Sequence, residues 1–441
     1  MSRSKLFSKN SKRTGNRSHG CRCSCICLPA AESNRYFHLL ERHPYLCSLF
    51  VCLLLNALYF GGEAYLAQNA VLLETLALLA AGAAVLWRLV RYQPQKKPAA
   101  VCVSVVYTLL VLAGAWCYHK ARHSGLWVLV GGCAVLSGLF WLTRKQYHNQ
   151  RRRVSLLLLG TSFLLKFFYV CYTPITRRQH DVGKFGDADN HAGYITYLLQ
   201  HHQLPDFDPR GHWQFYHPPL HHMISALWLW LSEHVFGISN AAAQESLQTL
   251  SLFYAMAIVI TAYRILRHFR LEGMALYVPL AVVAFHPSFI LFSGSINNDA
   301  LSVVFILGAV LWTLKWYEKQ TWEGIVKIAL CIGLGMMTKL SAAMVAIPVA
   351  AVFLVVLARQ LRQRNWRILG QLGGFAVICF PLGLWYPVRN LVRFGVPLTY
   401  VQEMPENSVQ YLGEQLFLSR ILDFSPHQVA SVFEQWVQRT G

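Results

Sequence analysis

Long apolar segments alternate with short polar segments along most of the chain. Each apolar segment has about 17 to 25 residues, the length that an α-helix needs to cross the hydrocarbon core of a bilayer, which is about 30 Å thick. We therefore expect an all-α polytopic membrane protein. The pattern predicts about eleven transmembrane helices, near residues 45–61, 69–90, 98–117, 125–143, 153–172, 247–266, 275–293, 299–317, 323–337, 340–358 and 369–387.

Most of the polar residues that could take part in catalysis or ligand binding lie in residues 173–246, between the fifth and sixth predicted helices. If the N-terminus is cytoplasmic, five crossings place this segment outside as a large first external loop. Within it, residues 221–236 are apolar and rich in tryptophan, but they are too short and too interrupted by polar residues for a crossing. We expect an interfacial helix that lies flat on the membrane, which keeps the later basic segments on the cytoplasmic side.

Composition supports the membrane interpretation, since 55% of residues are hydrophobic and 14% are charged, against about 25% charged residues in a typical soluble domain. The formal net charge of +20 raises nucleic-acid binding as an alternative. The basic residues, however, lie in short segments between apolar runs, as the positive-inside rule describes. Those segments are the N-terminal tail, 88–97, 144–153, 264–270 and 359–367. This distribution argues against nucleic acid.

The predicted domain organisation has four parts: a basic cytoplasmic tail over 1–44, a four-helix membrane extension over 45–150, a transmembrane catalytic core over 151–400, and an external C-terminal tail over 401–441. Four cysteines alternate in the basic tail, at Cys21, Cys23, Cys25 and Cys27. Their spacing could hold a metal ion or accept acyl chains, and the sequence does not decide between the two.

The external loop begins with a group of polar residues that includes Asp187, Asp189, His191 and Tyr194. A carboxylate at the membrane surface can take a proton from a hydroxyl nucleophile, or it can hold a divalent cation such as Mg²⁺ or Mn²⁺ against a phosphate. We therefore regard Asp187, Asp189 and His191 as candidate catalytic residues, with Asp187 and Asp189 as the candidate metal ligands. The alternative is a solvated loop in which aspartates cap turns.

Tyr216 and His217 precede two prolines, Pro218 and Pro219, at the start of the predicted interfacial helix. Adjacent prolines stiffen the backbone and would present both side chains rigidly. Six histidines in the loop raise a zinc site as an alternative: His201, His202, His212, His217, His221 and His222. The single HxxxH spacing among them spans both prolines, which disfavours zinc.

Three further segments carry polar residues near predicted helix ends. Asn298 and Asp299 precede a predicted helix, where capping alone would explain them. Lys339 interrupts an apolar region and is a candidate partner for a phosphate, although it could also extend to the interface. Arg389 lies at the external end of the last predicted helix, against the charge trend, and could contact an anionic donor or anchor the helix end.

The order of these segments resembles the C-type (GT-C) glycosyltransferase superfamily, which includes dolichyl-phosphate-mannose protein mannosyltransferases and bacterial lipid A aminoarabinose transferases. The resemblance covers roughly residues 153–400. It is carried by Asp187-Ala-Asp-Asn-His-Ala-Gly-Tyr194, Tyr216-His-Pro-Pro-Leu220, Asn298-Asp-Ala-Leu301, Thr338-Lys339 and Trp385-Tyr-Pro-Val-Arg-Asn390.

The resemblance implies roles for these residues. By position, Asp187 matches the family's essential acid, which is usually proposed as a base or as a metal ligand. The family often has a second acid directly after it, whereas Ala188 stands there in this chain and the next acid is Asp189. Tyr194, Tyr216, His217, Asn298, Asp299, Lys339 and Arg389 are then the candidate substrate-binding residues, with Lys339 and Arg389 on the donor phosphate.

The implied activity is transfer of a sugar from a polyprenyl-phosphate donor to a hydroxyl acceptor on a glycan, lipid or protein, with inversion at the anomeric carbon. It would take place on the periplasmic face of a bacterial inner membrane or the lumenal face of the endoplasmic reticulum. A transporter is the first alternative, but it would place ionisable residues near the midplane of broken helices in two related halves. A non-catalytic scaffold is the second, and it would not need Asp187, Lys339 and Arg389 on one side of the membrane.

Overall fold

The structure is a computed structural model that describes residues 42–59, 150–175, 182–398 and 400. The chain divides into two units, Met1–Pro44 and Tyr45–Gly441, and the candidate site lies in the second. The predicted helices near 69–90, 98–117 and 125–143 lie outside the described residues, as do the C-terminal tail and nearly all of the basic N-terminal tail with its four alternating cysteines.

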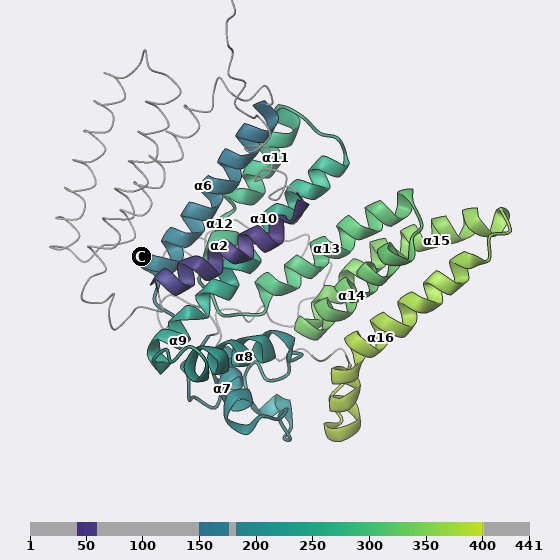
Figure 1. Cartoon of the computed structure of the whole chain (residues 1–441). Helices are drawn as coiled ribbons and strands as arrows, with labels where there is room; N and C mark the ends of the chain where they lie inside the picture. Colours follow the sequence, from purple (N-terminus) through teal and green to yellow (C-terminus); the bar gives the residue numbers. More distant parts are fainter. Residues whose placement is uncertain (1–41, 60–149, 176–181, 399, 401–441) are drawn as a thin grey trace, which may run out of the picture. The chain divides into compact units, whose positions relative to one another are not determined.

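The described residues are helical throughout their regular structure and contain no strand. In chain order the helices are α2 (Pro44–Tyr59), α6 (Gln150–Tyr172), α7 (Asn190–His201), η3 (Pro209–Gly211), α8 (Leu220–His234), α9 (Asn240–Ser246), α10 (Gln248–His268), α11 (Met274–Ala284), α12 (Pro287–Leu291), α13 (Asp299–Glu318), α14 (Trp322–Thr338), η4 (Leu340–Val345), α15 (Ala346–Arg362) and α16 (Arg367–Phe394) (Figure 1). The all-helical prediction is confirmed for this part of the chain.

Within the described ranges, five helical segments are long and apolar enough to cross a membrane: Val154–Cys171, Asn240–His268, Asp299–Glu318, Leu340–Arg362 and Arg367–Phe394. All five overlap segments that the sequence predicts to be transmembrane. Helix α14 also forms where a crossing is predicted, but its 17 residues are at the short end of the spanning range. The described helices fit a polytopic membrane protein, while the total of about eleven crossings stays a prediction.

The span predicted near 275–293 is not one continuous helix, because the structure divides it into α11 and α12. Pro287 has no N–H to continue the ladder, and it pushes the residue before it out of the helical region. Accordingly, His286 is extended, with φ −60° and ψ 125°. The carbonyl of Ala284, at the end of α11, accepts hydrogen bonds from Lys166 Nζ and Ser162 Oγ of α6, each at 2.8 Å.

Helices α13, α14 and α16 pack against one another around a buried apolar core that includes Trp316. Gly333 of α14 faces Leu382 of α16, where an added Cβ would approach the Leu382 Cβ to 2.8 Å. Gly383 of α16 faces Met336 in the same way, at 2.8 Å from the sulfur. Small residues therefore allow the two helices to approach closely, as is common between helices in membranes.

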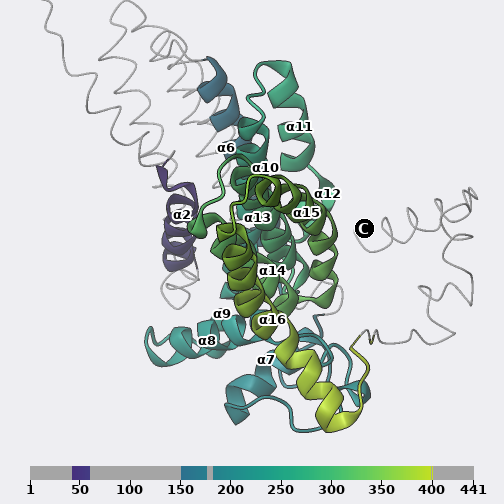
Figure 2. The ribbon, with the colours of Figure 1, turned by 90° about the vertical axis from the view of Figure 1, so that its right-hand side faces the viewer.

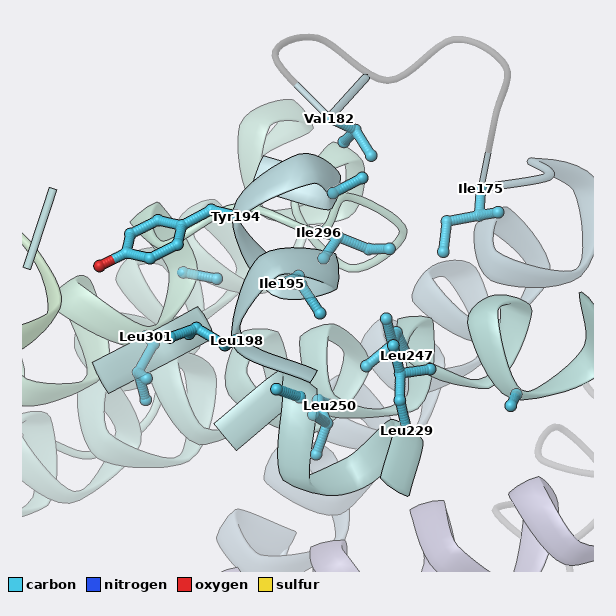
Figure 3. Close-up of a cluster of buried hydrophobic side chains, with 14 of the residues drawn as sticks. Ile175, Val182, Tyr194, Ile195, Leu198, Leu229, Leu247, Leu250, Ile296 and Leu301 are labelled. Atoms are coloured by element: carbon cyan, nitrogen blue, oxygen red, sulfur yellow. The ribbon is translucent and has the colours of Figure 1, made fainter. Parts of the chain in front are cut away.

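The segment between α6 and α10 folds into the short helices α7, α8 and α9, which lie together at one end of α10, α13 and α14 in both views (Figures 1 and 2). Helix α7 is amphipathic and buries Tyr194, Ile195 and Leu198 on one face. These side chains join an apolar cluster to which α8, α10 and α13 also contribute (Figure 3). The cluster fixes the segment between α6 and α10 to the helices that carry the other motifs.

Helix α8 has the reverse of the usual amphipathic pattern. Its buried side chains are largely polar and include His221, His222, Ser225 and Ser232. Its exposed side chains include Met223, Leu227 and Trp230, which recur at helical spacing on one face. Polar groups on the inside and large apolar groups on the outside are unusual for a helix surrounded by water.

Candidate active site

The loop before α7 presents Asp187 on a tight turn. The Asp187 N–H donates to the carbonyl of Lys184 at 3.2 Å, and the Asp187 carboxylate accepts a hydrogen bond from the Lys184 N–H, also at 3.2 Å. Gly186 occupies the turn position that needs the left-handed region, with φ +92°. The side chain of Asp187 is exposed, so its carboxylate is accessible from solvent.

A close backbone approach holds this turn against α7. A Cβ added to Gly193 would lie 2.6 Å from the Asp187 carbonyl oxygen, which is closer than real Cβ contacts. The N–H of Gly186 also donates to Thr196 Oγ1 at 3.2 Å. Only glycine at position 193 allows the turn to lie this close to the helix, so Gly193 positions the candidate catalytic acid.

Asp189 has a different environment from Asp187. Its Oδ1 accepts a hydrogen bond from the backbone N–H of Trp213 at 3.0 Å and lies 3.4 Å from His212 Nδ1. The next residue, Asn190, donates its N–H to the Trp213 carbonyl at 2.9 Å. Asp189 therefore ties the start of α7 to the segment before α8.

Four buried histidines meet between α7 and the start of α8, and we call His191, His217, His221 and His222 the histidine group. His191 Nδ1 lies 2.9 Å from His222 Nε2. The His191 ring centroid is 5.9 Å from that of His217 and 6.4 Å from that of His221. The sequence predicted roles for His191 and His217, whereas His221 and His222 were considered only as zinc candidates.

Burial favours the neutral form in the histidine group. Desolvation lowers the pKa of His217 to about 3, with Lys339 and His221 adding to the effect. Burial also lowers the pKa of His221 to about 4. The pKa of His222 lies well below its ordinary value, first because of burial and then because of His191, His221 and His217. Three of the four imidazoles are therefore uncharged near neutral pH.

Tyr194 joins α7 to α16 through a pair of hydroxyl groups. The Tyr386 hydroxyl donates to the carbonyl of Phe215 at 3.0 Å. Because a phenol has one hydrogen, Tyr194 must be the donor in its 3.2 Å contact with the Tyr386 hydroxyl. The ring of Tyr194 also stacks on that of His222, with centroids 4.3 Å apart. Tyr194 thus acts here as a structural contact between helices.

Asp299 and Lys339 come together although they are far apart in the sequence. Lys339 Nζ, at the end of α14, forms an ion pair with Asp299 Oδ1 at the start of α13. Asn298 supports the same junction, because its Nδ2 donates to the carbonyl of Thr338 at 3.1 Å. The effect of Lys339 on the pKa of His217 shows that this junction adjoins the histidine group.

Arg389 contacts the loop that follows α7. Its guanidinium donates to the carbonyl of Pro205 at 2.6 Å and to Asn390 Oδ1 at 3.0 Å. Two other arginines make contacts nearby: Arg393 pairs with Asp206, and Arg210 donates to the carbonyl of Phe394 at 3.0 Å. These bonds tie the end of α16 to residues 205–210.

Most of the predicted residues lie close together, whereas Asp187 and Asp189 lie in the loop before α7 and have partners of their own. His191, Tyr194 and His217 lie together, Tyr216 contacts His217 with ring centroids 4.2 Å apart, and the Asn298, Asp299 and Lys339 junction adjoins them. Arg389 Cζ lies 6.0 Å from the centroid of the Tyr386 ring and the guanidinium acts electrostatically on Tyr194, but no contact joins Arg389 to Lys339 among those that the structure gives. Their predicted common role at a phosphate stays a prediction.

Asp187 and Asp189 are the predicted metal ligands. In the described ranges no group of three or more His, Cys, Asp or Glu side chains is arranged to hold a metal ion. Asp189 accepts a hydrogen bond from the Trp213 backbone, although half of its side chain is exposed, and the Asp187 carboxylate is exposed as well. The predicted metal role of Asp187 and Asp189 stays a prediction.

Lys166, Tyr386 and His222 have structural roles that the sequence did not reveal. Lys166 lies inside an apolar helix. An ionisable residue at such a position is unusual, so the sequence alone could have identified Lys166 as a residue with a specific role. Tyr386 and His222 stand inside or beside motifs that the sequence does reveal. Their partners, however, depend on contacts across the fold.

Residues 217–385 match the family model described as dolichyl-phosphate-mannose-protein mannosyltransferase. The matched range begins at His217 and includes Asn298, Asp299 and Lys339. No curated protein and no solved structure matches the chain. The match and the apolar helices together indicate an integral membrane protein. The resemblance expected from the sequence is thus confirmed over residues 217–385, which match the family model for dolichyl-phosphate-mannose-protein mannosyltransferases.

Proposed function

We propose that the protein transfers a sugar from a polyprenyl-phosphate donor to a hydroxyl acceptor, with inversion, on the non-cytoplasmic face of its membrane. The observation that carries the proposal is the meeting of motif residues from distant segments. Lys339 of the α14 end pairs with Asp299 of the α13 start and acts electrostatically on His217 before α8. All three lie within the range that matches the mannosyltransferase family.

The proposed reaction is a direct displacement. The acceptor oxygen forms a bond to the anomeric carbon while the bond from that carbon to the phosphate oxygen breaks, and the hydroxyl proton passes to Asp187. The exposed carboxylate of Asp187 supports the role of base, because a base must reach a hydroxyl that arrives from outside. The lipid phosphate leaves as an anion, which a cation at Lys339 would stabilise.

Phosphate binding by Lys339 and Arg389 would require both residues to exchange partners. Lys339 is paired with Asp299, and Arg389 donates to a backbone carbonyl. A phosphate offers stronger, charge-assisted acceptors than a carbonyl oxygen. The exchange is therefore favourable for Arg389, whereas at Lys339 the phosphate competes with another anion.

The surface of α8 supports a site at the membrane boundary. Met223, Leu227 and Trp230 are exposed on one face, while histidines and serines point inward. A face of this kind suits a helix that lies in the interfacial region with its apolar side toward acyl chains. Because the histidine group lies on the opposite face of the same helix, a donor anchored in lipid could present its head group near it.

The two alternatives differ from this proposal in what they require. A transporter would have ionisable residues near the midplane of broken helices. The break between α11 and α12, with Lys166 beside it, is one such feature. The family match favours a transferase over both a transporter and a scaffold.

The proposal is tested with membranes that contain the full chain. Polyprenyl-phosphate mannose and polyprenyl-phosphate aminoarabinose, each labelled in the sugar, are supplied with candidate acceptors, and label in the product is measured. Transfer from at least one donor that is abolished in Asp187→Asn, but retained in the remote Glu323→Gln variant, supports the proposal. Uptake of label into sealed vesicles without transfer would instead support the transporter.

A further inference from the structure

The contact between His191 and His222 has the geometry of a well-aligned hydrogen bond. The nitrogens are 2.9 Å apart, the ring planes differ by 17°, and the ring centroids are 5.2 Å apart. Nearly coplanar rings at this separation meet edge to edge, so that the N–H and the lone pair lie in line. One of the two rings must therefore donate and the other accept.

The other nitrogen of His222 decides which ring donates. A neutral imidazole has one N–H and one bare nitrogen. Among the described residues, the buried Nδ1 of His222 has no hydrogen-bond partner. If His191 donated to Nε2, His222 would carry its hydrogen on this unpartnered Nδ1. If His222 donates from Nε2, the unpartnered atom is a bare acceptor, which costs less than a buried orphan N–H.

The His222 ring is also held in place from its other side. Tyr194 stacks on it with centroids 4.3 Å apart, and the Tyr194 hydroxyl is itself fixed by Tyr386. His222 is completely buried, so water does not compete for its Nε2 hydrogen. Burial keeps His222 neutral by holding its pKa well below the ordinary value.

We propose that His222 is a positioning residue that donates from Nε2 to His191 Nδ1, which fixes His191 as the tautomer with its hydrogen on Nε2. His191 then acts as a hydrogen-bond donor in the site and not as a base. A neutral N–H donor can stabilise negative charge that develops on a substrate oxygen. This last role rests on the proposed glycosyl transfer, whereas the tautomer does not.

The tautomer is tested by NMR on the full chain labelled with ¹⁵N in histidine and held in lipid nanodiscs, with the His191 signal assigned from His191→Gln. We expect the Nε2–H form of His191 in the unmodified protein. His222→Phe removes the donor and should let His191 populate the Nδ1–H form. His222→Gln keeps an amide donor and should restore the original spectrum. His221→Phe is the matched control, because His221 is an equally buried neighbour with no hydrogen bond to His191. It should leave the tautomer unchanged.

Kinetics separate the positioning role from a structural one. We expect His222→Phe to lower kcat about 10-fold to 100-fold with little change in KM for the donor, as for other residues that orient a functional histidine. His222→Gln should recover most of that loss. An Nδ1–H tautomer in the unmodified protein, or an unchanged His191 spectrum in His222→Phe, would overturn the proposal. If no preparation transfers sugar, the proposed function fails while the NMR result still decides the tautomer.

Discussion

Lys339 at the end of α14 pairs with Asp299 at the start of α13, forty positions earlier in the chain. Both side chains are partly exposed, at 29% for Lys339 and 35% for Asp299. The pair carries no net charge, so an incoming phosphate must compete with the Asp299 carboxylate for the lysine. We therefore expect Asp299 to limit how strongly Lys339 can hold an anion.

This relationship predicts opposite effects of two substitutions on donor binding. Lys339→Gln should weaken binding of a polyprenyl phosphate by about 1.5 to 3 kcal/mol, the usual value of a charge-assisted hydrogen bond. Asp299→Asn should strengthen it, because the lysine loses its competing anion. Equilibrium binding of a fluorescent polyprenyl phosphate measures both. Equal affinity for the polyprenyl phosphate in the unmodified protein, Lys339→Gln and Asp299→Asn would show that Lys339 does not bind the phosphate.

Arg389→Gln should also weaken donor binding, by about 2 kcal/mol, if Arg389 reaches the phosphate. The substitution also breaks the bond to Pro205. Arg393→Gln is the matched control, since it removes a neighbouring link between α16 and the loop through Asp206. Comparable losses in the two variants would mean that Arg389 acts only by holding the loop.

Asp187→Asn should lower turnover by about 100-fold to 10,000-fold, the usual contribution of a general base. Folding and donor binding should survive, because Asn can still accept from the Lys184 N–H. Single-turnover transfer assays measure the effect. Turnover at the original rate in Asp187→Asn would end the proposal that this residue is the base.

Asp189→Asn provides the comparison for the Asp187 substitution. Its carboxylate accepts from the Trp213 backbone, a bond that Asn can also make. We therefore expect a mild loss of turnover. A loss as large as that of Asp187→Asn would instead favour a paired-acid or metal site.

Gly193→Ala tests the positioning of the Asp187 turn. The added Cβ would lie 2.6 Å from the Asp187 carbonyl oxygen, so the turn must move. A displacement of about 1 Å can cost about 100-fold in rate, and we expect a loss of that order in kcat with donor affinity retained. Gly373→Ala on α16 is the control, because nothing lies within 4 Å of its Cβ position. Normal kcat in Gly193→Ala would show that the position of the turn does not matter.

Lys166 and Ser162 should behave as partly redundant partners of the Ala284 carbonyl. Each donates to it at 2.8 Å, so either alone leaves the carbonyl satisfied. The double variant Lys166→Met, Ser162→Ala should lose more stability than the sum of the single losses, by about 1 to 3 kcal/mol for an unsatisfied buried group. Thermal unfolding in detergent measures the cycle. Additive losses would contradict this explanation of the helix break.

The predicted topology can be tested at Gly211, which is exposed on the external segment. Charge distribution predicts that Gly211 and Gln410 both lie on the non-cytoplasmic face. Single cysteines placed there in a background without other accessible cysteines should react with a membrane-impermeant reagent added from that face. Labelling of either position from the cytoplasmic face only would reverse the assignment.

The sequence predicted the positions of most described helices because apolar length is a local property. It predicted one helix over 275–293, although Pro287 stood in the middle of that range. Proline is tolerated inside other helices here, since α16 contains Pro381 and Pro387. At the break before Pro287, Lys166, more than a hundred residues away, supplies a donor to the carbonyl of Ala284 at the end of α11. No local pattern shows that contact.

In the candidate site, too, residue type could be predicted from the sequence, whereas contacts between distant residues could not. The chemistry of Asp187 was suggested by residue type and position, but its difference from Asp189 depends on the Trp213 backbone. The partner of Lys339 could not be read from the sequence, because it requires the packing of α13 against α14. Residue type indicated which side chains are candidates for the site. Only the fold shows which of these side chains already have a partner within the protein.

The two hydrogen bonds of Tyr386 have a consequence for biosynthesis. The external segment and α16 are separated by more than a hundred residues, and a membrane protein is inserted in chain order. Phe215 and Tyr194 receive their partner only after α16 has left the ribosome. The His191 and His222 contact needs no residue beyond α8. The external segment can therefore pair its histidines early, but it completes its hydrogen bonds only when the last described helix arrives, so a chain interrupted before Tyr386 would expose an unfinished site to quality control.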